Sequence, residues 1–146
     1  MSAEASVGRD EAMSTKERKE IQTALMNCRS KKLRFRIFQL LKLLNLHGRD
    51  LRVQRAVDQS YYIQKQQELE TLEERLNESL DIVLRFRNNP VQLDNKSHDE
   101  QLGQLVERAL FYKEKLENCY SHVFARWKMD FVNLKRIVGK TVEVMN

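Results

Sequence analysis

A thiol and an imidazole stand one helical turn apart at Cys119 and His122. On a helix this spacing places both on one face, where they could offer two ligands to a metal ion or a nucleophile beside a base. A zinc site usually takes three or four protein ligands, and no third ligand stands at motif spacing. Cys119 also belongs to an apolar stripe, in which a small buried thiol is ordinary. We therefore expect no metal site, no thiol catalysis and no cofactor.

The remaining titratable residues form no catalytic motif. The chain has no phosphate-binding glycine loop, no dinucleotide-binding GxGxxG, no HExxH and no GxSxG. The acidic residues near the middle of the chain are spread around a helix and lack the Glu-x-x-His pattern of metal-binding bundles. They are Glu68, Glu70, Glu73, Glu74, Glu78 and Asp81. The sequence predicts a protein that is not an enzyme.

A basic segment is the strongest charge feature. Residues 29–55 hold nine Lys or Arg residues and a single acid, Asp50. Such a segment can be a solvated or internally paired helix face, a site for an acidic protein, or a site for nucleic acid or an anionic membrane. The predicted anion or acidic-partner patch consists of Arg29, Lys31, Lys32, Arg34, Arg36, Arg49, Arg52 and Arg55.

The elements that carry these residues are expected to be long helices. The chain is rich in helix-forming residues, with one proline, Pro90, and few glycines. Ser14 with Glu17 and Ser97 with Glu100 form capping-box patterns. Gly48 is expected to end the first helix in the left-handed conformation, and Asp50 to cap the second. We predict helices at about 14–47, 51–88 and 97–145 in one domain spanning 14–146, after a disordered tail at 1–13.

Short connections favour antiparallel neighbours. The predicted fold is therefore all-α: three long helices in an up-down-up antiparallel bundle or coiled coil. The apolar stripes of the second and third helices match when Val83 faces Leu102, and the first turn places Arg36 opposite Tyr62. In this register the third helix outruns the first beyond about Leu134 and forms an overhang.

The segment 33–46 carries Leu, Ile or Phe on more than one face. A helix that is apolar nearly all round must be covered nearly all round, by a deep core within the chain or by a partner. An aromatic series at Tyr120, Phe124, Trp127 and Phe131 raises the same two alternatives. The predicted partner interface comprises Leu40, Leu41, Leu43, Leu44, Phe124, Trp127, Phe131, Ile137, Val138 and Val142.

The compartment is expected to be intracellular, nuclear or cytoplasmic. Cys28 and Cys119 are far apart and suggest a reducing environment. The first residues are polar and partly acidic, unlike a secretory or mitochondrial leader. No apolar run reaches the roughly 18 residues that a membrane span needs.

Together these patterns predict a non-enzymatic scaffold or adaptor subunit that assembles with other helical proteins by coiled-coil packing in a multi-subunit complex. Its partners would be other helical subunits in a hetero-oligomer, with nucleic acid or an anionic membrane as minor candidates. One alternative is a basic nucleic-acid- or chromatin-binding protein that uses residues 29–55. Another is a self-contained, spectrin-like three-helix module. The sequence does not identify the partner, the stoichiometry or the biological process.

Overall fold

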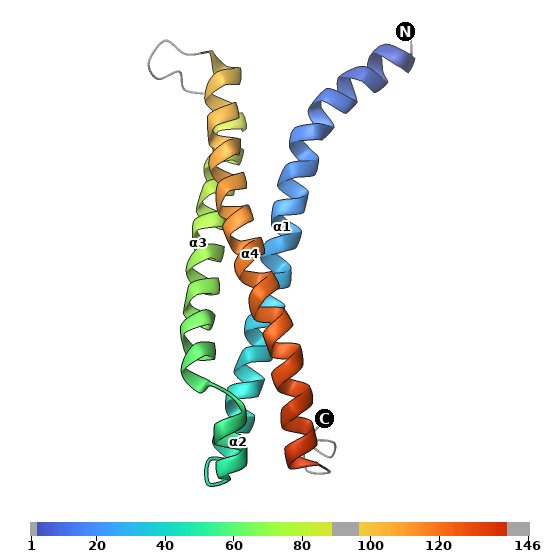
Figure 1. Ribbon diagram of the computed structural model, residues 1–146. Helices are drawn as coiled ribbons and strands as arrows, with labels where there is room; N and C mark the ends of the chain where they lie inside the picture. Colours follow the sequence, from blue (N-terminus) through green and yellow to red (C-terminus); the bar gives the residue numbers. More distant parts are fainter. Residues whose placement is uncertain (1–2, 89–96, 140–146) are drawn as a thin grey trace. The chain divides into compact units, whose positions relative to one another are not determined.

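The structure is a computed structural model that describes the backbone of residues 3–88 and 97–139. Within these ranges it describes the side chains of Arg18 and of the residues from Ile21 onward. The described residues form four α helices and no strand: α1 Ala3–Leu46, α2 Leu51–Ala56, α3 Gln59–Asn88 and α4 His98–Val138 (Figure 1). The helices pack against one another as an all-α bundle, which confirms the predicted fold class.

The first helix begins earlier than predicted. α1 starts at Ala3, so that Ser14 lies inside the helix and is not its N-cap. Residues 3–13, which we expected to be disordered, are therefore helical. Their alanine and glutamate residues have high helix propensity, which accounts for the continuation of the helix through them.

The turn after α1 differs from the expected left-handed cap. Gly48 does not have a positive φ. Its amide donates a hydrogen bond to the Asn45 carbonyl at 3.2 Å, and a Cβ at this position would lie 3.2 Å from the same oxygen. The glycine is therefore suited to a close backbone approach. Asp50 caps α2 as predicted, because its side chain accepts a hydrogen bond from the Arg52 amide at 3.0 Å.

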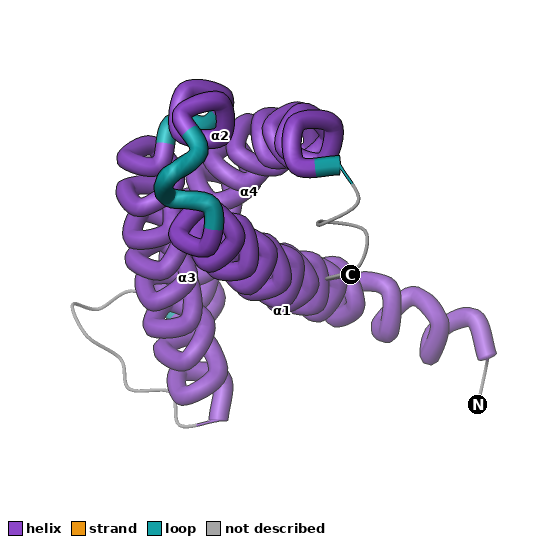
Figure 2. The backbone as a smooth tube through the Cα atoms, turned by 90° about the horizontal axis from the view of Figure 1, so that it is seen from below, coloured by secondary structure: helices purple, strands orange, loops and turns teal. Residues whose placement is uncertain are grey.

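The predicted second helix is broken in two. Val57 is extended, with φ −131° and ψ 130°, and its side chain is buried. Asp58 then accepts a hydrogen bond from the Tyr61 amide at 3.2 Å, as an N-cap of α3 does. The short helix α2 is thus set off from α3 by a loop (Figure 2). An Asp cap next to a β-branched residue is the local signal that the sequence prediction overlooked.

The ends of the last two helices are mostly as expected. α3 ends at Asn88, and the Ser97 hydroxyl accepts a hydrogen bond from the Glu100 amide at 3.2 Å at the start of α4. α4 ends at Val138, whereas we predicted a helix to residue 145; residues 140–145 of that prediction lie outside the described residues, and the difference is seen at Gly139. That residue has φ +64°, and its amide donates to the Lys135 carbonyl at 2.7 Å, which together form a left-handed cap.

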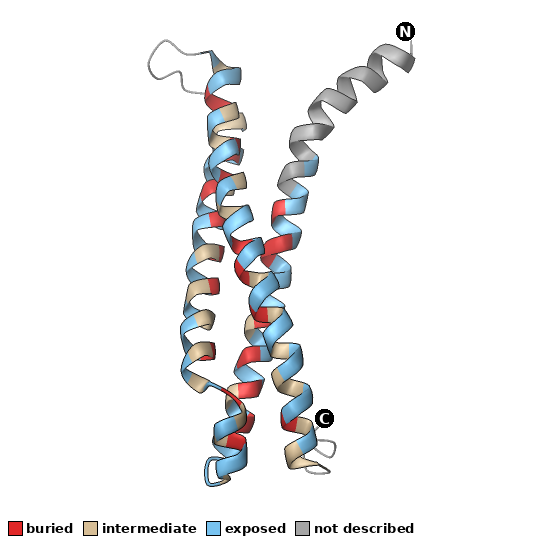
Figure 3. Ribbon diagram, viewed as in Figure 1, coloured by how far each residue is buried: buried red, intermediate tan, exposed pale blue. Residues whose placement is uncertain are grey.

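The backbone divides into two compact units, to which α1, α3 and α4 all contribute. The first unit comprises Met1–Arg29 and Leu72–Leu116; the second comprises Ser30–Thr71 and Glu117–Asn146. In α1, α3 and α4 the buried residues recur at helical spacing (Figure 3).

The first unit is organised around the hairpin of α3 and α4. Val83, Leu102 and Val106 form its apolar cluster, which confirms that Val83 pairs with Leu102. The rings of Phe86 and His98 stack at a centroid distance of 4.8 Å. From α1, Asn27 donates a side-chain hydrogen bond to Asn77. A polar pair of this kind between helices favours one register, because other alignments lose the hydrogen bond.

The second unit has an apolar core that extends from the α1–α2 turn along α3 and α4. Its fully buried side chains include Ile37 of α1, Val53 of α2, Tyr62 of α3 and Leu134 of α4. The predicted register between the first two helices places Leu44 opposite Gln54 and Arg34 within two residues of the position opposite Gln66. The Gln54 side-chain amide donates to the Leu44 carbonyl at 3.3 Å, and the Gln66 amide donates to the Arg34 carbonyl at 3.4 Å, so both contacts lie close to that register. The bond from Gln59 to Asn45 Oδ1 departs from it, next to the break before α3.

Candidate protein-binding interface

The part of α1 in the second unit has one buried face. Leu33, Ile37, Leu40 and Leu44 follow one another at intervals of four, three and four residues, and all are buried within the unit. Leu43 is also buried, and Leu41 is half-buried. Three leucines predicted for the partner interface, Leu40, Leu43 and Leu44, therefore belong to the core of this unit. A partner cannot reach them without unfolding it.

The opposite face of the same helix segment carries exposed apolar side chains. Phe35 is 60% exposed, Phe38 is 47% exposed and Leu46 is 62% exposed. At 100° per residue, Phe35 lies almost diametrically opposite Leu44 on the helix, and Leu46 lies close to the line of Phe35. We call Phe35, Phe38 and Leu46 the outer apolar face. The sequence indicated it as a second apolar stripe of the segment 33–46, whereas the leucines that we predicted for the partner interface lie mainly on the stripe that the structure buries.

The outer apolar face is interspersed with lysines. Lys31, Lys32 and Lys42 are exposed, and Lys42 Nζ lies 5.1 Å from the centre of the Phe38 ring. None of the three forms an ion pair with another residue that the structure describes. Their alkyl stems can lie along apolar surface while their charges stay in water. This segment thus presents apolar area together with positive charge.

The rest of the predicted basic patch is divided among different surroundings. Arg29 is exposed in the first unit, whereas the other members belong to the second. Arg34 is half-buried, and its carbonyl accepts a bond from the Gln66 side chain at 3.4 Å. Arg36 is engaged with aromatic rings of α4. The residues of 29–55 therefore do not form one uniform surface.

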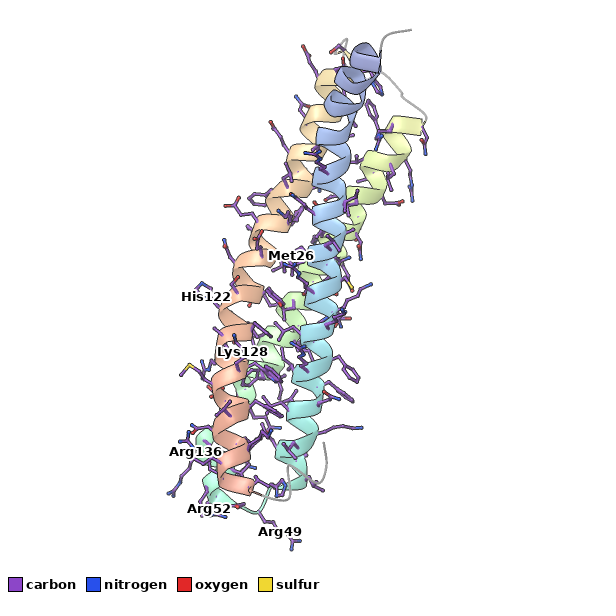
Figure 4. All side chains as sticks on the ribbon, turned by 90° about the vertical axis from the view of Figure 1, so that its right-hand side faces the viewer. Met26, Arg49, Arg52, His122, Lys128 and Arg136 are labelled. Atoms are coloured by element: carbon purple, nitrogen blue, oxygen red, sulfur yellow. The ribbon has the colours of Figure 1, made fainter. Side chains whose placement is uncertain are left out.

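The turn and α2 carry the last three basic residues of the patch, Arg49, Arg52 and Arg55, all exposed. Arg52 forms an ion pair with Asp50 at 3.0 Å. The hydrogen bond from Arg52 lowers the pKa of Asp50, and the same bond raises the pKa of Arg52. Arg49, Arg52 and Arg136 of α4 all lie toward the same end of the second unit (Figure 4).

The predicted aromatic interface on α4 is a ladder of stacked rings. Tyr120, Phe124, Trp127 and Phe131 follow one another with centroid distances of 5.4, 6.2 and 5.1 Å, and neighbouring planes differ by at most 13°. Phe124, Trp127 and Phe131 are half-buried. We call these four residues the aromatic ladder.

Cations cover the aromatic ladder. The Arg36 guanidinium carbon lies 5.5 Å from the ring centres of both Phe124 and Trp127, and so connects α1 to α4. Lys128 lies 4.9 Å from the Phe124 ring centre, and Lys135 lies 5.7 Å from that of Phe131. Ring faces already in contact with one another and with cations leave little area for a partner. The ladder therefore serves mainly to pack the second unit.

The predicted C-terminal interface is described only in part. Ile137 and Val138 are half-buried within the second unit, and Val142 lies outside the described residues. Leu134, which marked the start of the expected overhang, is fully buried. The described end of α4 is thus partly covered by its own unit.

Cys119 and His122 do not share an environment. Cys119 is buried, and desolvation, reinforced by the negative charge of Glu68, raises the pKa of its thiol to about 11. His122 is exposed. A thiol that stays protonated at neutral pH is a poor nucleophile and metal ligand. No group of three His, Cys, Asp or Glu side chains in the described ranges is placed to hold a metal ion.

None of the described helices is both long and apolar enough to cross a bilayer. Comparison with known proteins gives no functional information. No protein-family model, no curated protein and no solved structure matches the chain.

Proposed function

We propose that this protein is a non-enzymatic helical scaffold or adaptor subunit that assembles with other helical proteins in a complex. The observation that carries the proposal is the outer apolar face of α1. Phe35, Phe38 and Leu46 are 47–62% exposed, on a helix segment whose opposite face is buried.

The energetics favour a partner on this face. Full burial of a Phe or Leu side chain contributes about 1.5–3 kcal/mol relative to leaving it in water. Phe35, Phe38, Lys42 and Leu46 stand at intervals of three, four and four residues, which is the spacing with which one helix packs along another. A partner helix laid along α1 would cover all four side chains at once.

The outer apolar face also distinguishes the proposal from a self-contained three-helix module. Such a module covers its wide apolar faces within its own chain, whereas two phenylalanines of α1 are left in solvent here. We extend the proposal to an intracellular location, nuclear or cytoplasmic. Both cysteines are free and Cys28 is exposed, which suits a reducing compartment.

Site-specific photo-crosslinking tests the proposal. A photoreactive phenylalanine analogue is placed at position 35 or 38 and, as a control, at Phe111, which is 51% exposed on α4 in the first unit. In the native cells we expect positions 35 and 38 to crosslink to a discrete helical protein and position 111 not to do so. Equal crosslinking from all three positions, or none from any, would refute a specific interface on α1.

A further inference from the structure

We infer that the partner segment that docks on the outer apolar face is an amphipathic helix with acidic flanks. This inference rests on the proposed function and adds the chemistry of the partner. The outer apolar face, which consists of Phe35, Phe38 and Leu46, lies on one helix segment of the second unit. Three lysines, Lys31, Lys32 and Lys42, lie beside these apolar side chains on the same side of that segment.

Charge is the first support. No Asp or Glu occurs between Glu20 and Asp50, so α1 itself provides no carboxylate to the lysines of this face. The lysines form no ion pair with any other residue in the described part of the chain. Asp50, the next acid along the chain, is already paired with Arg52. The positive charge of this face is therefore left for a partner to neutralise.

Geometry is the second support. The outer apolar face and its neighbouring lysines together extend from Lys31 to Leu46, which on an α helix is about 24 Å. A partner helix of about four turns matches that length. Its apolar stripe would cover the phenylalanines and Leu46, and carboxylates beside the stripe would reach the three lysines. This is the arrangement in which flanking charges select coiled-coil partners.

A second copy of the same face is a poor occupant, because two such faces would bring lysine against lysine across the contact. Nucleic acid is also a poor occupant of this face. Phosphates would neutralise the lysines but leave Phe35, Phe38 and Leu46 without an apolar counterpart. An acidic amphipathic helix satisfies both components of the face.

The test uses the full chain and three synthetic helical peptides of about 20 residues. All three carry the same leucine stripe; the residues beside it are Glu, Gln or Lys. We expect the Glu peptide to bind the full chain about tenfold more tightly than the Gln peptide, and the Lys peptide to bind most weakly. The advantage of the Glu peptide should shrink as salt rises from about 50 to about 300 mM.

Two variants separate charge from apolar contact. Lys32→Glu with Lys42→Glu should reverse the preference, so that the Lys peptide binds better than the Glu peptide. Phe35→Ser with Phe38→Ser should weaken all three peptides. Matched controls in the first unit are Arg108→Glu with Lys115→Glu and Phe111→Ser, which change exposed residues of the same types and should leave every affinity unchanged.

The outcomes distinguish the inference from the proposed function. If the Gln or Lys peptide binds the unmodified chain as well as the Glu peptide, and the phenylalanine variant still loses binding, the acidic-partner inference is wrong while docking on α1 stands. If the phenylalanine variant binds every peptide like the unmodified chain, both are wrong.

Two further measurements test whether a second copy of the chain or a lipid surface occupies this face instead. Sedimentation velocity of the chain alone would show a dimer that Phe35→Ser with Phe38→Ser dissolves, if a second copy covers the face. Co-sedimentation with phosphatidylcholine vesicles containing phosphatidylserine would depend on the same phenylalanines if the face is a lipid site. Either result would overturn the acidic helix as the occupant.

Discussion

Tyr62 of α3 donates its phenolic hydrogen to Asp130 Oδ2 of α4 at 2.5 Å, and the tyrosine is fully buried. Arg126 Nε lies 3.7 Å from the same carboxylate oxygen, and the Arg126 guanidinium carbon lies 3.9 Å from the centre of the Tyr61 ring. Within the second unit, this polar contact at the edge of the apolar core joins α3 to α4.

Replacement of Tyr62 by Phe tests this contact. The variant keeps the ring in the core but removes the donor from a charged acceptor, which should lower the free energy of unfolding by about 1.5–3 kcal/mol. Urea denaturation measures the change. Tyr61→Phe is the control, because Tyr61 contacts Tyr62 and Arg126 through its ring, which phenylalanine keeps. Equal losses in both variants would contradict a specific role for the Tyr62 hydroxyl.

Truncation should destabilise the protein much more on the buried face of α1 than on its exposed face. Leu40→Ala removes a buried side chain and should lower the free energy of unfolding by about 2–5 kcal/mol. Phe35→Ala removes a larger but exposed side chain and should change it by less than about 1 kcal/mol. Thermal and urea unfolding of the two variants measure the difference. A larger loss for Phe35→Ala would mean that the core and solvent faces of α1 are exchanged.

Much of the fold could be predicted from residue types that act locally. The Ser97 cap and the apolar stripes predicted the hairpin of α3 and α4 with Val83 beside Leu102, and Asp50 predicted the start of α2. The break at Val57 could not be found in this way, because helix propensity alone favours continuing from Leu51 into α3. The competing signal was the cap offered by Asp58, which acts only once the chain bends.

The sequence indicated that α1 carries a candidate interface, but it did not identify which residues of α1 face outward. The sequence showed that the segment 33–46 is too apolar to be covered on one side alone. Which stripe faces inward depends on the rotation of α1 about its axis, and that rotation is set by tertiary contacts such as Arg36 over the aromatic ladder. Amphipathic periodicity cannot choose between two apolar stripes on one helix.

Arg36 should stabilise the second unit through the aromatic ladder. Arg36→Met retains an aliphatic stem but loses the cation over Phe124 and Trp127, and should cost about 0.5–2 kcal/mol. Trp127 is the only tryptophan, so its fluorescence reports directly on this contact. We expect a changed emission maximum in Arg36→Met and none in the control Lys31→Met. Identical spectra and stabilities for the two variants would exclude the cation–π contact.

The cysteines should differ in reactivity and in their dependence on pH. Cys28 is exposed and should react with iodoacetamide quickly, whereas Cys119 is buried and its thiol has a pKa of about 11. The rate at Cys119 should rise about tenfold per pH unit above neutrality until that pKa is reached, because the thiolate reacts. Mass spectrometry of the alkylated chain locates the label at each pH.

The raised pKa of Cys119 also fixes the direction of a stability change. The folded state holds the thiol proton more tightly than the unfolded state, whose ordinary cysteine pKa is about 8.5. The contribution of this group to the free energy of unfolding is therefore complete below that pH and falls as the pH rises toward about 11. Cys119→Ala should remove this part of the alkaline pH dependence. An unchanged slope would contradict burial of the thiol.

Two glycines of α4 should respond to alanine with opposite signs. Gly103 lies inside the helix, and beyond the neighbouring helix backbone no atom lies within 4 Å of an added Cβ, so Gly103→Ala should raise the free energy of unfolding by about 0.5–1 kcal/mol. Gly139 has φ +64° at the helix end, where a Cβ is strained, so Gly139→Ala should lower it by about 1 kcal/mol. Urea denaturation with far-ultraviolet circular dichroism measures both. A gain of helix and stability in Gly139→Ala would show instead that α4 can continue past this residue, as its sequence pattern alone predicts.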